Sequence, residues 1–371
     1  LDDGAGIYTT GYDGSILYND RNIAGNIVLN GAGAGMGTDK PAYTAAEGIY
    51  LDDRTINVQV RNNTVANCSR GIFVHNASRI SIIQNTLFNN NEQILFVDNG
   101  AAISHPVNQC IVRENVFFSK YLSQTVASFE TVDNRFSNFG SFDYNYYCRP
   151  MDDYATILTR YTTGSGSVSD LIDLKTWQST YGLDLNSYKS PAAISAYGVI
   201  SRSGSNKVQN GSFDSDTKGW NYWSNYNNAS ISWINDAGLN GGCLKLSSTP
   251  SGRTDAVMLA YGTIGEIKQN QDYIIRFSMI GSAQDRAVNL SFWDNVSSSG
   301  SNNNIGTVLT DIRRKEYELH FKPDKNISNA RLNFVLQADG GGILIDNVEV
   351  FEAVVQKANP DDSIRFVYNA S

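Results

Sequence analysis

The sequence contains no long apolar run and few basic residues, and both absences exclude classes of function. No stretch of its 371 residues approaches the roughly 18 consecutive apolar residues of a membrane-spanning helix. Its 29 Lys and Arg are outnumbered by 37 Asp and Glu, which leaves a net charge of −8. Binding to nucleic acid needs a basic surface. We therefore expect neither a nucleic-acid partner nor a membrane partner.

Cysteines are few and lack the spacing of a metal site. The chain has four, at Cys68, Cys110, Cys148 and Cys243, and no two of them form a CxxC pair. Cys68 and Cys110 fall in or beside predicted strands, so we expect buried thiols. A disulfide between these two residues is the alternative that the sequence leaves open.

The helical period of 3.6 residues is missing from the first part of the chain, where a repeat takes its place. GIYLDD at 48–53 aligns with GIFVHN at 71–76, and NTV at 63–65 aligns with NTL at 85–87. Apolar and polar residues alternate within each copy, which predicts short strands. Strands that return about every 22 residues predict a parallel β-helix of about six coils.

Asparagine is abundant, with 40 residues in the chain, and many of them recur at matched offsets in the repeat. Asn tolerates left-handed backbone, and its side chain bonds neighbouring backbone groups. We therefore expect the Asn side chains of successive coils to bond one another as a ladder along the axis. The positions are Asn26, Asn63, Asn85, Asn115, Asn134 and Asn145.

The predicted β-helix occupies residues 1–195. Its last part, SDLIDLKTWQSTYG, favours a short helix that begins at Ser169 or Asp170 and ends at Gly182. We expect this segment to cover the open end of the β-helix. Because the chain has no initial Met and opens inside a repeat, we interpret it as a piece of a larger protein.

A second all-β domain follows a predicted linker at residues 196–207. Residues 208–352 contain eight or nine alternating stretches with Gly and Asn turns and no helix between them. This pattern predicts an antiparallel β-sandwich of jelly-roll type. Residues 353–371 are predicted to form a tail.

The second domain resembles the jelly-roll carbohydrate-binding modules attached to xylanases and glucanases. The resemblance lies in NGSFD at 210–214, in Gly219 followed by Trp220, and in IDNV at 345–348. It implies a domain that binds sugars through exposed aromatic residues. Trp220 is expected in the core, and the sugar contacts are assigned to Trp223, Tyr226 and Trp293.

The same resemblance implies a structural Ca²⁺ where the first and last strands of the sandwich meet. Oxygen ligands suit this ion. The acidic residues at the matching places are Asp214, Asp216 and Asp346.

The first domain is similar to right-handed parallel β-helix proteins that act on plant polysaccharides. The stretches DDGAGIYT, GIYLDD, GIFVHNA and KTWQSTYGLDLNS carry this similarity. The group includes pectate-lyase-like enzymes, β-helix glycoside hydrolases and non-catalytic modules appended to xylanases. It predicts the fold but leaves the activity open.

Strand alternation predicts which side chains of the β-helix point outward. If Ile49 and Leu51 face the core, then their neighbours form two outward columns that run from coil to coil. Aromatic faces beside hydrogen-bonding groups suit a sugar chain. A cover formed by the loop at 31–47 is the alternative. The proposed sugar contacts are Tyr8, Tyr50, Asp52, Phe73 and His75.

The outward residues also leave a catalytic interpretation open. Glycoside hydrolysis needs two carboxyl groups about 5 to 9 Å apart, one of them with a raised pKa. If the β-helix is an enzyme, the candidates are Asp52, Asp53 and Asp3, with His75 as an acid–base group.

The favoured hypothesis is non-catalytic binding of a plant cell-wall polysaccharide of the xylan type. The chain would be an accessory region of a secreted or cell-surface bacterial glycoside hydrolase, with other domains of the same polypeptide as its partners. The alternative is that the β-helix is itself a glycoside hydrolase and that the sandwich is its targeting module.

Overall fold

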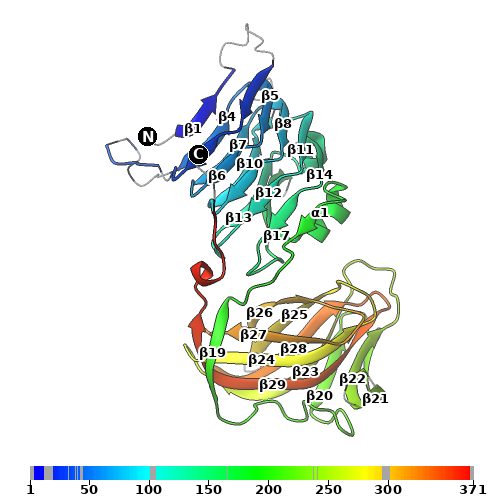
Figure 1. The fold of residues 1–371 in the computed structure, drawn as a ribbon. Coiled ribbons are helices and arrows are strands. Elements are labelled where there is room, and N and C mark those ends of the chain that lie inside the picture. The colour runs from blue at the N-terminus through cyan, green and yellow to red at the C-terminus, as the bar shows by residue number, and fades with distance from the viewer. Residues whose placement is uncertain are drawn as a thin grey trace. The chain divides into compact units, whose positions relative to one another are not determined.

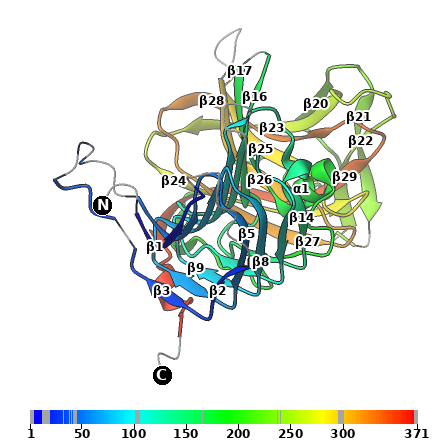
Figure 2. The ribbon, with the colours of Figure 1, turned by 90° about the horizontal axis from the view of Figure 1, so that it is seen from above.

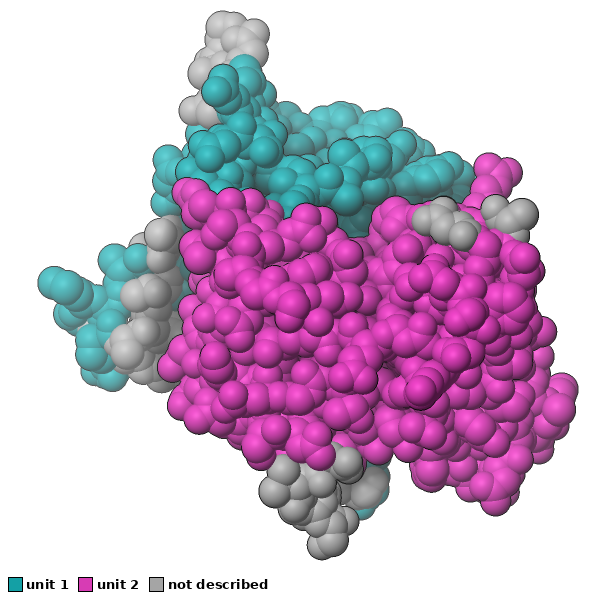
Figure 3. All heavy atoms as spheres, turned by 90° about the horizontal axis from the view of Figure 1, so that it is seen from below, with its two compact units in different colours: residues 1–196, 358–371 teal, residues 197–357 magenta. Residues whose placement is uncertain are grey.

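The computed structural model divides the chain into two compact units (Figure 3). The β-helix unit comprises Leu1–Ala196 and Ala358–Ser371, and the sandwich unit comprises Tyr197–Lys357. The described residues are 4–11, 20–31, 33–37, 39, 41, 45–100, 106–164, 166–236, 238–239, 241–294 and 301–367. None of the helices in these ranges is long and apolar enough to cross a membrane.

The β-helix unit contains three sheets whose strands are joined by parallel pairing (Figure 1). The first sheet has the lateral order β1 (Gly4–Thr9), β4 (Ala46–Leu51), β7 (Arg70–His75), β10 (Glu92–Asp98), β13 (Thr125–Thr131), β16 (Ile157–Thr163) and β17 (Gly166–Ile172). Only the last pair in this order, β16 with β17, is antiparallel. Six parallel strands in this sheet confirm the predicted β-helix of about six coils.

The other two sheets complete each coil. The second sheet has the order β2 (Arg21–Ala24), β5 (Ile56–Arg61), β8 (Ser78–Ile83), β11 (Cys110–Arg113) and β14 (Gly140–Asp143). The third has the order β3 (Ile27–Leu29), β6 (Thr64–Ala66), β9 (Thr86–Phe88), β12 (Val116–Phe118), β15 (Tyr146–Cys148) and β18 (Tyr188–Lys189). Inward side chains of all three sheets share one apolar core.

The predicted asparagine ladder is present between the second and third sheets. Each side-chain amide nitrogen donates to the side-chain oxygen of the next asparagine at 2.9–3.0 Å. The ladder consists of Asn26, Asn63, Asn85, Asn115 and Asn145, and it ends on the carboxylate of Asp184. Asn134 was wrongly included. It precedes the 3₁₀ turn Phe136–Phe139 and accepts a hydrogen bond from Tyr181 instead.

The ladder asparagines are not the left-handed residues of their corners. The residue before each of them has a φ between 54° and 69°: Gly25, Asn62, Gln84, Glu114 and Tyr144. Left-handed backbone is unfavourable for residues other than Gly and Asn. The buried amides therefore hold a corner that three of these five residues do not favour by themselves.

A short helix and its flanking turns lie at the end of the β-helix. Helix α1 (Leu174–Tyr181) lies beside β14, the last strand of its sheet, in both views (Figures 1 and 2). Its Trp177 stacks on Phe129 with ring centroids 4.5 Å apart, so this helix packs against the β-helix core. The helix ends at Gly182, as predicted, but its N-cap is Asp173.

The N-cap prediction failed because Ser169 and Asp170 belong to β17. The polar residues that alternate along this edge strand are of the same types as the residues that favour an N-cap. The side chain of Asp173 accepts from the backbone N–H of Thr176, which is the N-cap hydrogen bond.

All four cysteines are buried free thiols. Burial raises the pKa of Cys110 and Cys148 to about 12 and that of Cys243 to about 11. Because Cys68 and Cys110 are both free thiols, they do not form the disulfide that the sequence left open.

The sandwich unit consists of two antiparallel sheets around a second apolar core. The first has the order β21 (Ala229–Asp236), β22 (Gly241–Ser248), β29 (Gly342–Lys357), β24 (Asp272–Gly281) and β27 (Lys315–Phe321). The second, called here the five-stranded sheet, has the order β20 (Trp220–Ser224), β23 (Val257–Ile267), β28 (Ile327–Gln337), β25 (Ala287–Asp294) and β26 (Ser301–Leu309). The predicted β-sandwich is confirmed, although β20 and β26 were not recognised in the sequence.

The segments at the two ends of the sandwich differ from the sequence prediction. Residues 196–207, expected as a linker, include strand β19 (Tyr197–Ser203), which pairs antiparallel with β29. The expected tail at 353–371 begins as the last part of β29. Its later residues return to the β-helix unit, where Ile364 is buried and Phe366 stacks on Phe88 at 4.7 Å.

Candidate functional site

Among the described residues, two places combine aromatic and hydrogen-bonding side chains, and the first is the outer side of the first β-helix sheet. The strand register puts Tyr8, Tyr50 and Phe73 in one column, as predicted, and Leu95 continues this column. Their exposure is different from the prediction. Tyr8 is 50% exposed, but Tyr50 is 5% and Phe73 is 9% exposed.

The predicted exposed aromatic column is therefore wrong for its central members. Tyr50 and Phe73 stack face to face at 4.6 Å, and Leu95 completes a small buried cluster with them. Ring faces that are covered in this way are not open to a sugar. The column packs the outer side of the sheet rather than forming a sugar platform.

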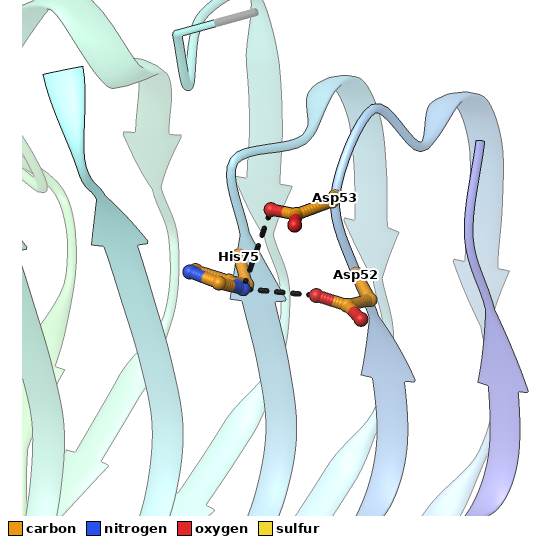
Figure 4. A group of neighbouring side chains, drawn as sticks. All are labelled: Asp52, Asp53 and His75. Atoms are coloured by element: carbon orange, nitrogen blue, oxygen red, sulfur yellow. Dashed lines mark hydrogen bonds and ion pairs between the residues drawn. The ribbon is translucent and has the colours of Figure 1, made fainter. Parts of the chain in front are cut away.

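The second outward column ends in a hydrogen-bond network around His75 (Figure 4). Nδ1 of His75 lies 2.9 Å from Oδ1 of Asp52 and 3.5 Å from Oδ1 of Asp53. The hydroxyl of Tyr8 donates to Oδ2 of Asp52 at 2.7 Å. These contacts use both oxygens of the Asp52 carboxylate.

The network also fixes the tautomer of the imidazole. The backbone N–H of Asn99 donates to Oδ1 of Asn76 at 2.9 Å, so the other side-chain atom of Asn76 must be its NH₂ group. This NH₂ group lies 2.7 Å from Oδ1 of Asp53 and 3.0 Å from Nε2 of His75. Nε2 is therefore the acceptor, and Nδ1 carries the proton that His75 donates to Asp52.

The charge of Asp52 follows from these contacts. Burial pushes the pKa of Asp52 upward, but hydrogen bonds from His75 and Tyr8 outweigh burial and hold the pKa at about 2. A general acid in glycoside hydrolysis needs a raised pKa instead. Asp52 is therefore held as a carboxylate. Asp3, another of the catalytic candidates, lies outside the described residues.

Asp52, Asp53 and His75 also meet the spacing of a metal site. Their ligand atoms all lie within 4.8 Å of one another, and no other such group of His, Cys, Asp and Glu occurs among the described residues. However, Nδ1 of His75 and the carboxylate oxygens of Asp52 and Asp53 already take part in hydrogen bonds of the network.

The second place is the outward side of the five-stranded sheet. Core residues such as Ala260, Phe334 and Leu290 alternate with side chains on this side, which form three rows across the strands. We call these rows the outer face. They are Trp223–Leu259–Val335–Asn289–Thr307, Asn221–Tyr261–Asn333–Ser291–Asn304 and Thr263–Arg331–Trp293–Asn302.

Aromatic rings and amides are interleaved on the outer face. The guanidinium carbon of Arg331 lies 4.2 Å from the ring centroid of Tyr261 and 5.4 Å from that of Trp293. Asn333 is only 2% exposed, and its amide donates to Ser291 at 3.4 Å. Oδ1 of Asn333 and Nε of Arg331 are buried without a hydrogen-bond partner.

The structure separates the three predicted sugar contacts of the sandwich. Trp223 is 52% exposed and lies on the outer face, as does Trp293. Tyr226 does not lie on it. Arg253 covers one side of its ring, and its hydroxyl donates to Asp255. Trp220 is buried in the core, as expected.

Sequence reasoning missed Tyr261, Arg331 and Asn333. Each alternates with buried core residues in a long strand, so period-2 alternation would have assigned them to the outward side. These residues lie near Trp293 because β28 is placed between β23 and β25 in the sheet, and this lateral order differs from the order of the strands in the sequence.

The three acids named for Ca²⁺ do not gather into one group. Oδ1 of Asp216 accepts from Lys218 and Asn210. Burial raises the pKa of Asp346, and the charge of Asp214 raises it further. A cation near Asp346 and Asp214 would relieve this repulsion, so a calcium site there stays a prediction.

Two family models match the chain. Residues 2–117 match a right-handed beta helix region, and residues 205–341 match a carbohydrate binding domain. No curated protein sequence matches.

Several solved structures are similar over part of the chain. A family 16 carbohydrate-binding module is 18% identical, with a TM-score of 0.30, over 40% of this chain and 100% of the module. The CBM22-1 and GH10 modules of a Clostridium thermocellum xylanase, complexed with xylohexaose, are 15% identical, with a TM-score of 0.32, over 40% of this chain and 29% of that one. Tailspike protein 4 of bacteriophage CBA120 is 15% identical, with a TM-score of 0.31, over 89% of this chain and 58% of that one.

The matched ranges fall within the two folds. The first covers the β-helix strands from β1 into β12, and the outer face, from Asn221 to Val335, lies in the second. The chain thus joins a right-handed β-helix region to a carbohydrate-binding domain.

Proposed function

We propose that the sandwich unit binds a plant cell-wall polysaccharide of the xylan type along its outer face. The observation that carries the proposal is the set of Tyr261, Trp293 and Trp223 rings beside buried, unsatisfied amide and guanidinium groups. The match of residues 205–341 to a carbohydrate binding domain supports it.

The physical basis is the amphipathic character of a sugar ring. Aromatic faces pack on the C–H surfaces of sugars, while amides and hydroxyls bond the sugar hydroxyl groups. Asn289 donates hydrogen bonds to Asn304 and Thr307, so polar side chains that can bond sugar hydroxyls lie along β25 and β26. Five strands about 4.8 Å apart span roughly 19 Å, which accommodates several sugars in line.

The wider role follows from the same proposal. The chain acts as an accessory region of a secreted or cell-surface bacterial glycoside hydrolase, and the sandwich keeps the enzyme on its substrate. The resemblance to modules of xylanases and glucanases supports this role.

Catalysis by the β-helix is not part of the proposal. Asp52 is held ionised by His75 and Tyr8, and both imidazole nitrogens of His75 are occupied. We expect these groups to stabilise the turn between coils rather than to transfer protons.

The test is calorimetric binding of the full chain to xylan, β-glucan, mannan and pectin. Trp293→Ala and Trp223→Ala each remove an aromatic face, and we expect at least a thirtyfold loss of affinity from the more central Trp293, about 2 kcal/mol. Tyr222→Ala is the matched control, because Tyr222 is an exposed aromatic one position from Trp223 and alternates to the other side. Unchanged affinity in both tryptophan variants would remove the outer face from the proposal.

A second measurement addresses the enzymatic alternative. Release of reducing sugar from the same polysaccharides is expected to be absent. Turnover that disappears in a folded Asp52→Asn variant would promote the β-helix to a glycoside hydrolase.

A further inference from the structure

Arg331 differs from the other arginines that form contacts in the sandwich unit. Five of them pair with carboxylates: Arg202, Arg253, Arg276, Arg286 and Arg314. Arg331 forms neither an ion pair nor a hydrogen bond with the described residues, and its Nε is buried without a partner. Its contacts are the rings of Tyr261 and Trp293.

The two rings leave the hydrogen-bonding edge of the guanidinium unused. Tyr261 is on β23 and Trp293 is on β25, so they flank Arg331, which is on β28 between them. Rings attract the cation but accept none of its five N–H groups in the strong planar geometry that a carboxylate provides. A planar guanidinium binds a carboxylate through two parallel hydrogen bonds.

No acidic side chain of the outer face competes for this cation. The three rows contain aromatic, amide, hydroxyl and aliphatic residues, with Arg331 as their one charged member. Asn333, the cross-strand partner of Tyr261, adds a buried oxygen without a donor. The face therefore holds an unmatched positive charge beside a site suited to sugar hydroxyls.

From this arrangement we infer that the outer face recognises a uronate, a sugar acid whose carboxylate binds Arg331 in a bidentate manner. The inference rests on the proposed function and narrows its ligand class. Trp293 or Tyr261 packs on the ring of the same sugar.

The charge balance favours an isolated uronate on a neutral chain. One cation matches one carboxylate, and the rest of the three rows is uncharged. The whole chain carries a net charge of −8, which opposes a polymer with a carboxylate on every sugar. The expected ligand is a neutral backbone with occasional acidic substituents.

The experiment compares three probes on the full chain by calorimetry: glucuronoxylan, the same glucuronoxylan with its carboxyl groups reduced to alcohols, and polygalacturonate. Wild-type protein is expected to bind intact glucuronoxylan tenfold to a hundredfold more tightly than the reduced form, the usual range for a charge-assisted hydrogen-bonded pair. In Arg331→Gln the ratio of the two affinities should fall to about one. Arg331→Lys, which keeps the charge without the planar fork, should give an intermediate ratio.

Arg313→Gln is the matched control, because it removes the same charge from an exposed turn off the outer face and should keep the wild-type ratio. Unfolding midpoints verify that each variant is folded. Equal wild-type affinity for intact and reduced glucuronoxylan would overturn the inference and leave the proposed function standing. Tighter binding of polygalacturonate would overturn the assignment to a neutral chain. Binding of no glycan at all would remove the proposed function and this inference together.

Discussion

Nδ2 of Asn85 donates to Oδ1 of Asn115 at 3.0 Å, although the two residues lie a full coil apart and are both buried. Oδ1 of Asn85 accepts from the backbone and the side chain of Asn63 on the other side. Each asparagine thus satisfies a backbone N–H of one neighbour and a side-chain oxygen of the other. The coils are joined through these amides as well as through the sheets.

Removing one amide is expected to be costly. Asn85→Ala leaves the backbone N–H of Asn63 buried without its partner, at about 1–3 kcal/mol, and removes the hydrogen bonds that the Asn85 amide donates to Asn115 and Val60. We expect the free energy of unfolding of the β-helix unit to fall by about 3 kcal/mol or more in chemical denaturation. Asn62→Gly is the control: Asn62 is exposed with a φ of 54°, which glycine accepts, so a change within about 0.5 kcal/mol is expected. Equal losses in both variants would contradict the role of the ladder.

Acid is expected to weaken the network around His75 through Asp52. Its pKa is about 2 in the folded protein against 3.8 as the ordinary value, so the stabilisation is complete above about pH 4 and is lost as pH falls toward 2. The difference in unfolding free energy between wild type and Asp52→Asn should therefore shrink over this range. A constant difference from pH 5 to pH 2 would show that the carboxylate charge is not involved.

Asp153 is expected to have the opposite pH dependence. Burial raises its pKa to about 6, and its Oδ1 has no hydrogen-bond partner. The folded state therefore binds the proton more tightly than the unfolded state, and stability falls as pH rises from about 4 through 6.

Asp153→Asn tests this expectation. The variant should be more stable than wild type at pH 7.5, and the gain should disappear near pH 4. Asp152→Asn is the neighbouring control, because Asp152 pairs with Arg149 at 2.8 Å and its loss should destabilise the protein at pH 7.5. A destabilised Asp153→Asn at pH 7.5 would refute the unfavourable burial of charge.

The stacked pair Tyr50 and Phe73 is expected to serve stability. Phe73→Ala removes a buried ring, and such changes cost about 3–5 kcal/mol. Tyr50→Phe keeps the stack and loses the hydroxyl, which contacts His75 at 3.4 Å and bonds Asp52, so it should cost less. The measurement is thermal unfolding of the full chain. A Phe73→Ala variant as stable as wild type would restore the interpretation of this column as a sugar platform.

These residues also show how far the sequence reaches. The repeat predicts the register of Tyr50 over Phe73, because a coil that repeats every 22 or 23 residues must stack equivalent positions. Alternation gives the direction in which a side chain leaves the sheet, but it does not give what lies over it, so the burial of this pair could not be predicted. In the sandwich, Trp223 and Trp293 were recognised by their chemistry alone. Arg331 and Tyr261 were missed because strands β23, β25 and β28 become neighbours only through long-range pairing.

The residues after Lys357 change what a single cut in the chain can do. The polypeptide leaves the β-helix unit at Ala196 and re-enters it at Ala358, where Lys120 pairs with Asp361 and Ile364 is buried against Phe88. A protease that cuts only between Ala196 and Tyr197 would leave the sandwich covalently joined to residues 358–367, which stay packed on the coils. Release of the carbohydrate-binding domain would require a second cut or dissociation of this segment, so the glycan-bound part is retained through damage that would free an ordinary appended module.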